Sequence, residues 1–263
     1  MKLDLIQGDE PVLVSFPHSG TDIPKTIESA MTNHALTLPD TDWFLPRLYD
    51  FVAQLGVSTI AAKFSRYVID PNRSIDGENL YPGQPTPKLC PTECFDGSPI
   101  YREGMQPDEF EVGKRTAEYW QQYHDSVQTE LSRIRNQFGV AVLFDAHSIS
   151  SSVPRLFDGK LPEFSMGTAR ESSCDPTLAQ GIESVLQSQS GYAWVFNGRF
   201  VGGYITRHYG QPDQNIHAVQ LELSKATYMD ESRDQWDDEK AKNVRPVLRQ
   251  ILESVLNWAK SQK

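Results

Sequence analysis

Two histidines each follow an apolar, strand-like run of residues. His18 comes two residues after the run 12–16, and His147 comes just beyond the run 140–144, with Asp145 before it. In open α/β sheets, ligands bind outside the carboxyl ends of the strands, so both imidazoles can converge there. The pair favours metal ligation, with Asp145 orienting His147. The alternative is that both histidines are hydrogen-bonded structural residues and Asp145 is a strand-end cap.

One carboxylate lies inside an apolar strand-like run. Glu222 stands among the apolar residues of 219–223, where an ionised carboxylate is costly without a partner. We interpret it as a general base whose pKa is raised by apolar surroundings. The alternative is a solvent-facing residue on a half-exposed strand.

An amide and a guanidinium follow a further apolar run. Asn72 and Arg73 come directly after Asp70 and Pro71, and such groups suit bidentate carboxylate binding. The alternative for Arg73 is a structural ion pair with a nearby aspartate.

The elements that must position these residues alternate along the chain. Apolar, β-branched runs predict strands at 12–16, 58–64, 67–70, 140–144, 194–196 and 217–223. Caps and helical periodicity predict helices at 42–55, 108–138, 176–189 and through the apolar stripe 244–256. We therefore expect one α/β domain over residues 1–263, with a mixed, mostly parallel sheet and helices on both faces.

The segment between Asn72 and Pro107 breaks this alternation. Its prolines and glycines exclude a long helix or a central strand. Long irregular segments are often functional, and residues 74–107 are read either as a rigid surface excursion or as an active-site rim or lid.

Composition narrows the function classes. The 25 Lys+Arg and 35 Asp+Glu residues give a net charge of −10, which argues against nucleic-acid binding because that requires a basic face. Hydrophobic residues make up 38% of the chain, which excludes a disordered chain. No apolar run is long enough to span a bilayer, and we expect no membrane partner.

The three cysteines and the N-terminus indicate a compartment. The N-terminus lacks an extended apolar stretch, so it does not resemble a secretory signal. The chain has three cysteines, Cys90, Cys94 and Cys174. An odd number does not suit a disulfide framework and is typical of a protein in a reducing compartment. We expect a cytoplasmic protein. Cys90 and Cys94 are interpreted as structural thiols, with a zinc site as the alternative.

Several standard catalytic motifs are absent from the sequence. It contains no Gly-x-Ser-x-Gly elbow, phosphate-binding Gly-Lys-Ser/Thr loop, dinucleotide glycine fingerprint or His-Glu-x-x-His. These absences disfavour a serine hydrolase, a nucleotide-driven enzyme and a standard dehydrogenase.

Together, the polar segments resemble a known family. The segments are 17–20 (PHSG), 40–43 (DTDW), 65–73 (SRYVIDPNR), 80–84 (LYPGQ), 145–148 (DAHS), 197–210 (NGRFVGGYITRHYG) and 220–223 (QLEL). They resemble the N-formylglutamate amidohydrolase family, from about residue 12 to residue 231. That family is in turn similar to zinc carboxypeptidases, so the resemblance implies a phosphorylase/hydrolase-like fold. It also implies hydrolysis of N-formyl-L-glutamate to formate and L-glutamate, in histidine degradation.

The resemblance also implies a metal centre. Its ligands would be His18, Asp42 and His147, holding Zn²⁺ or another divalent metal such as Co²⁺. In the zinc carboxypeptidases the acidic ligand follows the first histidine by three positions. In this chain that position is Thr21, which is not acidic. Asp42 is preferred, with Asp22 and Asp40 as alternatives, and a simple helix cap is the other interpretation of Asp42.

The remaining roles concern a small dicarboxylate substrate. Glu222 would be the general base, and Arg66, with Arg73 as the alternative, would stabilise the oxyanion. Expected substrate-binding residues are Asn72, Arg73, Arg199, Arg207 and His208. Hydrolysis of another N-acyl amino acid or of a peptide C-terminus is an alternative, as is a non-catalytic binder of acidic amino acids. The oligomeric state stays open.

Overall fold

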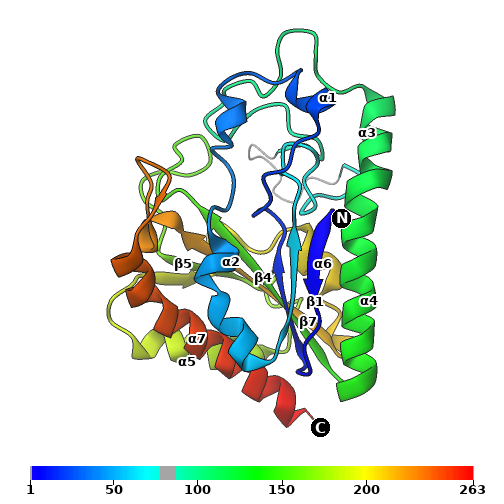
Figure 1. The fold of residues 1–263 in the computed structure, drawn as a ribbon. Coiled ribbons are helices and arrows are strands. Elements are labelled where there is room, and N and C mark those ends of the chain that lie inside the picture. The colour runs from blue at the N-terminus through cyan, green and yellow to red at the C-terminus, as the bar shows by residue number, and fades with distance from the viewer. Residues whose placement is uncertain (1, 78–86, 263) are drawn as a thin grey trace.

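Seven strands form one mixed sheet in the computed structural model, which describes residues 2–77 and 87–262 (Figure 1). The strands run in the spatial order β1-β3-β2-β4-β7-β5-β6. They are β1 Leu3–Ile6, β2 Val12–Phe16, β3 Ser58–Ala62, β4 Ala141–Ile149, β5 Phe164–Gly167, β6 Trp194–Phe196 and β7 Ile216–Ser224. A short separate hairpin pairs β8 Met229–Asp230 with β9 Gln235–Trp236.

The strand directions confirm a mixed, mostly parallel sheet. The pairs β2–β3, β2–β4, β4–β7 and β5–β6 are parallel. The pairs β1–β3 and β5–β7 are antiparallel.

Helices lie on both faces of the sheet, as expected. In Figure 1, α2 Leu45–Leu48, α5 Pro176–Ser188 and α7 Asp238–Ser261 lie on one side, and α4 Gln121–Phe138 and α6 Tyr204–Tyr209 lie on the other. The remaining helical segments are α1 Lys25–Glu28, η1 Ala35–Thr37, η2 Asp50–Leu55, α3 Glu109–Arg115, the π-helical η3 Thr116–Trp120, η4 Pro212–Gln214 and η5 Lys225–Thr227.

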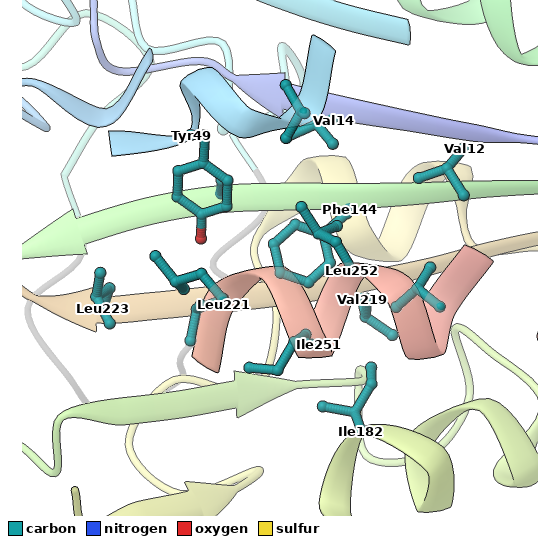
Figure 2. Close-up of a cluster of buried hydrophobic side chains, with 14 of the residues drawn as sticks. Val12, Val14, Tyr49, Phe144, Ile182, Val219, Leu221, Leu223, Ile251 and Leu252 are labelled. Carbon is teal, nitrogen blue, oxygen red and sulfur yellow. The ribbon is translucent and has the colours of Figure 1, made fainter. Parts of the chain in front are cut away.

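Alternation along the central strands creates two cores. Val12 and Val14 of β2 and Phe144 of β4 pack with Ile251 and other residues of α7 (Figure 2). The intervening side chains face α4, where Leu13 joins a second cluster. Successive strand residues point to opposite faces, so alternate residues of each strand contribute their side chains to different cores.

The expected strand at 67–70 is wrong. Residues 66–68 form a turn, in which the N–H of Val68 donates to the carbonyl of Ser65 at 2.9 Å. Tyr67, Val68 and Ile69 are nevertheless almost fully buried, within the core on the α4 side. Their apolar character therefore reflects packing beneath helices and loops, and the sheet does not use them.

The expected helix at 42–55 is also wrong as one unit. Phe44 adopts a left-handed conformation with φ 63° and precedes the short α2, and η2 follows after Tyr49. The helices at 108–138 and 176–189 are confirmed, the first as the continuous run α3–η3–α4 and the second as α5. The apolar stripe 244–256 lies inside the longer α7.

Several elements differ from expectation in length or are new. Strands β1 and β5 and the short α6 have no counterpart in the sequence prediction, and β4 continues to Ile149. Cys90, Cys94 and Cys174 are buried free thiols. None of the helices in residues 2–77 and 87–262 is long and apolar enough to cross a membrane.

Candidate active site

Three adjacent parallel strands present the candidate catalytic residues at their carboxyl ends. His18 lies two residues beyond the end of β2, and His147 lies near the end of β4. In the parallel register of β4 and β7, His147 stands opposite Glu222. The convergence expected from the sequence is therefore present, with His147 inside the strand.

The polar residues share one face of these strands. Asp145 and His147 of β4, with Gln220 and Glu222 of β7, alternate with apolar residues that pack toward α7. Because side chains alternate along a strand, all four project toward the opposite face. Polar groups therefore collect on one side without interrupting the α7-side core.

His18, Asp42 and His147 form a compact set of metal-ligand atoms. Nδ1 of His147 lies 3.2 Å from Nδ1 of His18 and 3.3 Å from Oδ2 of Asp42. Nδ1 of His18 lies 3.8 Å from the same carboxylate oxygen. All three residues are buried, so the set could hold one metal ion.

The outer ring nitrogens of both histidines contact carboxylates. Nε2 of His18 donates to Oδ1 of Asp70 at 2.7 Å, and Nε2 of His147 donates to Oδ2 of Asp145 at 2.9 Å. Carboxylates only accept, so these bonds place a hydrogen on each Nε2 and leave each Nδ1 facing the Asp42 carboxylate. This carboxylate–histidine arrangement is the one that orients metal ligands in proteins.

Each orienting carboxylate is itself anchored. Oδ2 of Asp70 accepts from Nη2 of the buried Arg66 at 2.7 Å. Oδ1 of Asp145 accepts from the hydroxyl of Ser15 at 2.9 Å, and Ser15 also bonds the Tyr123 hydroxyl. Burial opposes ionisation of Asp70, but its contact with His18, including the hydrogen bond, and the charge of Arg66 hold its pKa well below the ordinary value.

Of the three acidic candidates, Asp42 is the one that lies with both histidines. The N–H of Asp42 donates to the carbonyl of His18 at 3.0 Å, and its Oδ2 also accepts from the N–H of Ser148 at 3.2 Å. Oδ2 of Asp40 instead accepts from Tyr67 and from the Phe95 N–H. Asp22 is exposed. The helix-cap interpretation of Asp42 does not apply, because Phe44 occupies the N-cap of α2.

Glu222 lies beside this set and is 8% exposed. Burial raises the pKa of its carboxyl to about 7. Its Oε2 accepts a long hydrogen bond from Nε2 of Gln220, at 3.5 Å. The environment is thus apolar enough to keep this carboxyl close to its protonation midpoint at neutral pH.

A cavity opens directly onto the candidate ligands. It is lined by His18, Arg66, Asn72, Arg73, Pro87, Phe95, His147, Ser148, Ile149, Leu156, Arg199, Phe200, Gly203, Gln220 and Glu222. Three arginines therefore reach one cavity beside the ligand set. Pro87 and Phe95 belong to the proline-rich segment, which supports its interpretation as an active-site rim. Residues 80–84, quoted for the resemblance, lie outside the described residues, as does the rest of 78–86.

Two expected substrate-binding residues lie elsewhere. Arg207 and His208, both on α6, are not among the described residues that line this cavity. Nε of Arg207 donates to the carbonyl of Gly202 at 2.9 Å. His208 is exposed, and its ring stacks on Tyr204 with centroids 4.9 Å apart. The structure therefore does not bring His208 to the other predicted residues.

Sequence reasoning missed three contributors to the site. Asp70 was part of a quoted segment, but its role in holding His18 depends on a turn that was expected to be a strand. Phe95 and Gln220 also line the cavity. Gln220 could have been found from the sequence, because it lies two positions before Glu222 and therefore on the same face of β7.

The fold and the site define an α/β protein with a candidate metal centre at the ends of parallel strands. The sequence profile of the family described as N-formylglutamate amidohydrolase matches residues 10–229. The chain is 49% identical to an N-formylglutamate deformylase of Pseudomonas aeruginosa, covering 99% of this chain and 98% of the relative. It is 46% identical to another of that name from Pseudomonas putida, covering 97% and 96%. The chain belongs to the N-formylglutamate amidohydrolase family, a family of enzymes.

Solved structures share the fold. An N-formylglutamate amidohydrolase from Ralstonia eutropha JMP134 superposes with a TM-score of 0.82 at 22% identity, covering 99% of this chain and 98% of the other. A gene product of Agrobacterium tumefaciens gives a TM-score of 0.70 at 18% identity, with coverage of 97% and 96%. The sheet and its flanking helices are thus common to chains of low sequence identity.

Proposed function

We propose that this chain is a metal-dependent N-formylglutamate deformylase, which hydrolyses N-formyl-L-glutamate to formate and L-glutamate. Two full-length relatives carry the name N-formylglutamate deformylase. The observation that carries the proposal is the convergence of His18, Asp42 and His147 beside Glu222 in a cavity reached by arginines. A place in histidine degradation and a cytoplasmic location are part of the same proposal.

The donor set fits Zn²⁺. His18 and His147 would each contribute Nδ1, and Asp42 would contribute Oδ2. Two imidazoles and a carboxylate are a ligand set of catalytic zinc sites, which keep a further position open, and Co²⁺ accepts the same donors. When bound, the ion would polarise the substrate carbonyl and lower the pKa of a coordinated water to about 7.

Glu222 is the proton carrier in this proposal. It takes a proton from the attacking water as the water oxygen bonds to the formyl carbon. When the carbon–nitrogen bond breaks, the carboxyl delivers that proton to the departing amine of glutamate. Burial raises the pKa of Glu222 to about 7, so both forms of the carboxyl are populated at neutral pH.

Arginines that face the cavity would handle the negative charges. Arg66, held by Asp70 at 2.7 Å, is fixed in place to stabilise the developing oxyanion. Arg73 and Arg199, with the Asn72 amide, would bind the two substrate carboxylates. Arg207 would act indirectly, because it holds the Gly202 carbonyl beside the Gly203 wall of the cavity. His208 has no role in this scheme.

Formate release from N-formyl-L-glutamate tests the proposal directly. We expect Glu222→Gln to lower kcat by roughly 10²- to 10⁴-fold, because the proton transfer is lost, with the metal content unchanged. Glu28→Gln, an exposed substitution on α1, is the matched control and should retain full activity. Removal of the metal should abolish activity, and Zn²⁺ should restore it. Full activity of Glu222→Gln or of the metal-free protein would contradict the mechanism.

Substrate scope separates the alternative activities. Initial rates with formyl, acetyl and succinyl glutamate should favour the formyl compound. Preference for a bulkier acyl group would move the chain to another N-acyl amino-acid hydrolase. Tight glutamate binding without formate release, even with added metal, would indicate a non-catalytic binder.

A further inference from the structure

A second group of metal-ligating side chains lies outside the catalytic set. His34 precedes η1, and Cys94 and Asp96 flank Phe95 within the proline-rich segment 74–107. One ligand atom from each of the three residues lies within 4.8 Å of the others. Nε2 of His34 is 3.0 Å from Oδ2 of Asp96.

The burial pattern gives this group an inner and an outer side. Cys94 is 1% exposed, whereas the side chains of His34 and Asp96 are 46% and 53% exposed. A cation entering from solvent would therefore meet the imidazole and the carboxylate first, with the thiol beneath them. The remaining coordination position would face water.

The donor types match a borderline-soft divalent cation. Zinc is bound by thiolate sulfur at about 2.3 Å and by imidazole nitrogen or carboxylate oxygen at about 2.0–2.2 Å. Ligand atoms around such an ion are separated by up to about 4 Å, so a small rotation of the exposed His34 or Asp96 would complete the geometry. Oδ1 of Asp96 accepts from the Ser98 N–H at 2.8 Å, which leaves Oδ2 to turn toward the ion.

We propose that His34, Cys94 and Asp96 form a second metal site that binds Zn²⁺ and braces the rim of the catalytic cavity. On binding, the Cys94 thiol releases its proton to solvent and the sulfur bonds the ion, so the affinity rises with pH. The ordinary alternative is an exposed His34–Asp96 ion pair above an unrelated buried thiol.

The position of Phe95 connects this site to the cavity. Phe95 lies between two of the ligands and lines the cavity. Its ring lies under the Arg66 guanidinium, 4.7 Å from the ring centroid, and its N–H donates to Asp40 at 2.8 Å. A bound ion would join this loop to the segment around His34, so the second site would fix the wall that Phe95 provides.

Cobalt absorption distinguishes the two sites. The catalytic set of His18, Asp42 and His147 contains no sulfur, so a thiolate-to-cobalt charge-transfer band in the near ultraviolet reports only the second site. We expect the wild-type chain to bind two Co²⁺ ions and to show this band. Cys94→Ser should lose the band and bind one ion. Cys174→Ser, at a buried thiol elsewhere, should keep the band and bind two Co²⁺ ions.

Two further variants keep the test decisive if Cys94→Ser fails to fold. His34→Ala changes a partly exposed side chain and should weaken the Co²⁺ affinity measured by this band at least ~10-fold. Asp42→Asn should keep the band while losing formate release, which separates the second site from the proposed function. Absence of the band in wild type at excess Co²⁺, or its survival in Cys94→Ser, would overturn the proposal.

Discussion

At the scale of single residues, the site is held by pairs of opposite charges that are buried together. Asp70 accepts hydrogen bonds from both His18 and Arg66, and it also accepts the N–H of Asn72 at 2.8 Å. A buried carboxylate is stable only when such partners surround it. One side chain therefore links a candidate metal ligand, a candidate oxyanion-binding arginine and the loop that carries Asn72.

The orienting role of Asp70 predicts a specific defect. Asp70→Asn removes the charge and turns an amide N–H toward either His18 or Arg66, both of which are donors. We expect the affinity for Zn²⁺ at the catalytic set to fall about 10- to 100-fold, measured by competition with a chelator. Asp76→Asn, an exposed change in the same loop, is the control. Equal affinities in the two variants would show that Asp70 does not orient His18.

The sequence shows some of these residues better than others. His18, His147 and Glu222 adjoin or interrupt apolar strands, so their positions follow from strand alternation. Asp42 is 24 residues beyond His18, and only the folded chain brings its N–H to the His18 carbonyl. Spacing alone therefore leaves three candidate acids, and long-range contacts in the folded chain bring Asp42 beside the two histidines.

At the scale of elements, strands and helices with strong local sequence patterns are predicted correctly. The elements that are missed or misplaced are those that tertiary packing determines. The runs 12–16 and 194–196 match β2 and β6, and the long helix ends at Gly139 with φ 82°. Strand β5 is only four residues long and includes Ser165 and Gly167, so its sequence has little strand character. Its pairing with β6 and β7 defines it, and pairing is not visible in a local pattern.

The start of α6 makes a close contact with the catalytic loop. Gly203 occupies the N-cap of α6, and its N–H donates to Gln220 at 2.7 Å. A Cβ at this position would overlap the side-chain amide of Asn72, whose Oδ1 accepts from the Ile205 N–H at 2.9 Å. The absence of a side chain at Gly203 thus allows α6 to fix Asn72 at the cavity.

This contact predicts opposite results for two glycine substitutions. Gly203→Ala should displace Asn72 and lower kcat/KM for formate release roughly 10- to 100-fold, because small displacements at an active site are costly. Gly113→Ala in α3, where a Cβ meets nothing within 4 Å, should leave kcat/KM unchanged. It should raise the free energy of unfolding by about 0.5–1 kcal/mol. Wild-type kinetics in Gly203→Ala would contradict this account of the contact.

At the scale of the whole molecule, charge acts against the proposed substrate at long range and for it at short range. The net charge of −10 repels a dicarboxylate. Arg66, Arg73 and Arg199 nevertheless gather at one cavity, where short distances and partial burial strengthen their attraction. The acidic composition argues against nucleic acid as a partner from the sequence alone, but the local concentration of arginines is visible only in the fold.

His124 joins three parts of the molecule in one buried contact. It lies on α4, donates from Nε2 to the Pro71 carbonyl at 2.8 Å, and accepts at Nδ1 from the Tyr209 hydroxyl of α6 at 2.8 Å. Both bonds use the neutral ring. Burial lowers the pKa of His124 to about 4, from an ordinary value of 6.5.

The buried neutral imidazole predicts an acid-sensitive stability. Between pH 6.5 and about 4 the unfolded chain binds a proton at residue 124 and the folded chain does not, so stability falls as the pH falls through this window. The stabilisation is complete above pH 6.5, and its loss amounts to at most about 3 kcal/mol.

His124→Gln lacks this titration. The free energy of unfolding of His124→Gln should be lower than that of wild type at neutral pH. This difference, measured by urea unfolding with a chelator present, should shrink toward pH 4. His34→Gln, at a partly exposed side chain, should keep the acid sensitivity of wild type. A deficit in His124→Gln that stays constant across the window would mean that His124 titrates alike in both states, and its burial between α4, α6 and Pro71 would then not be maintained in solution.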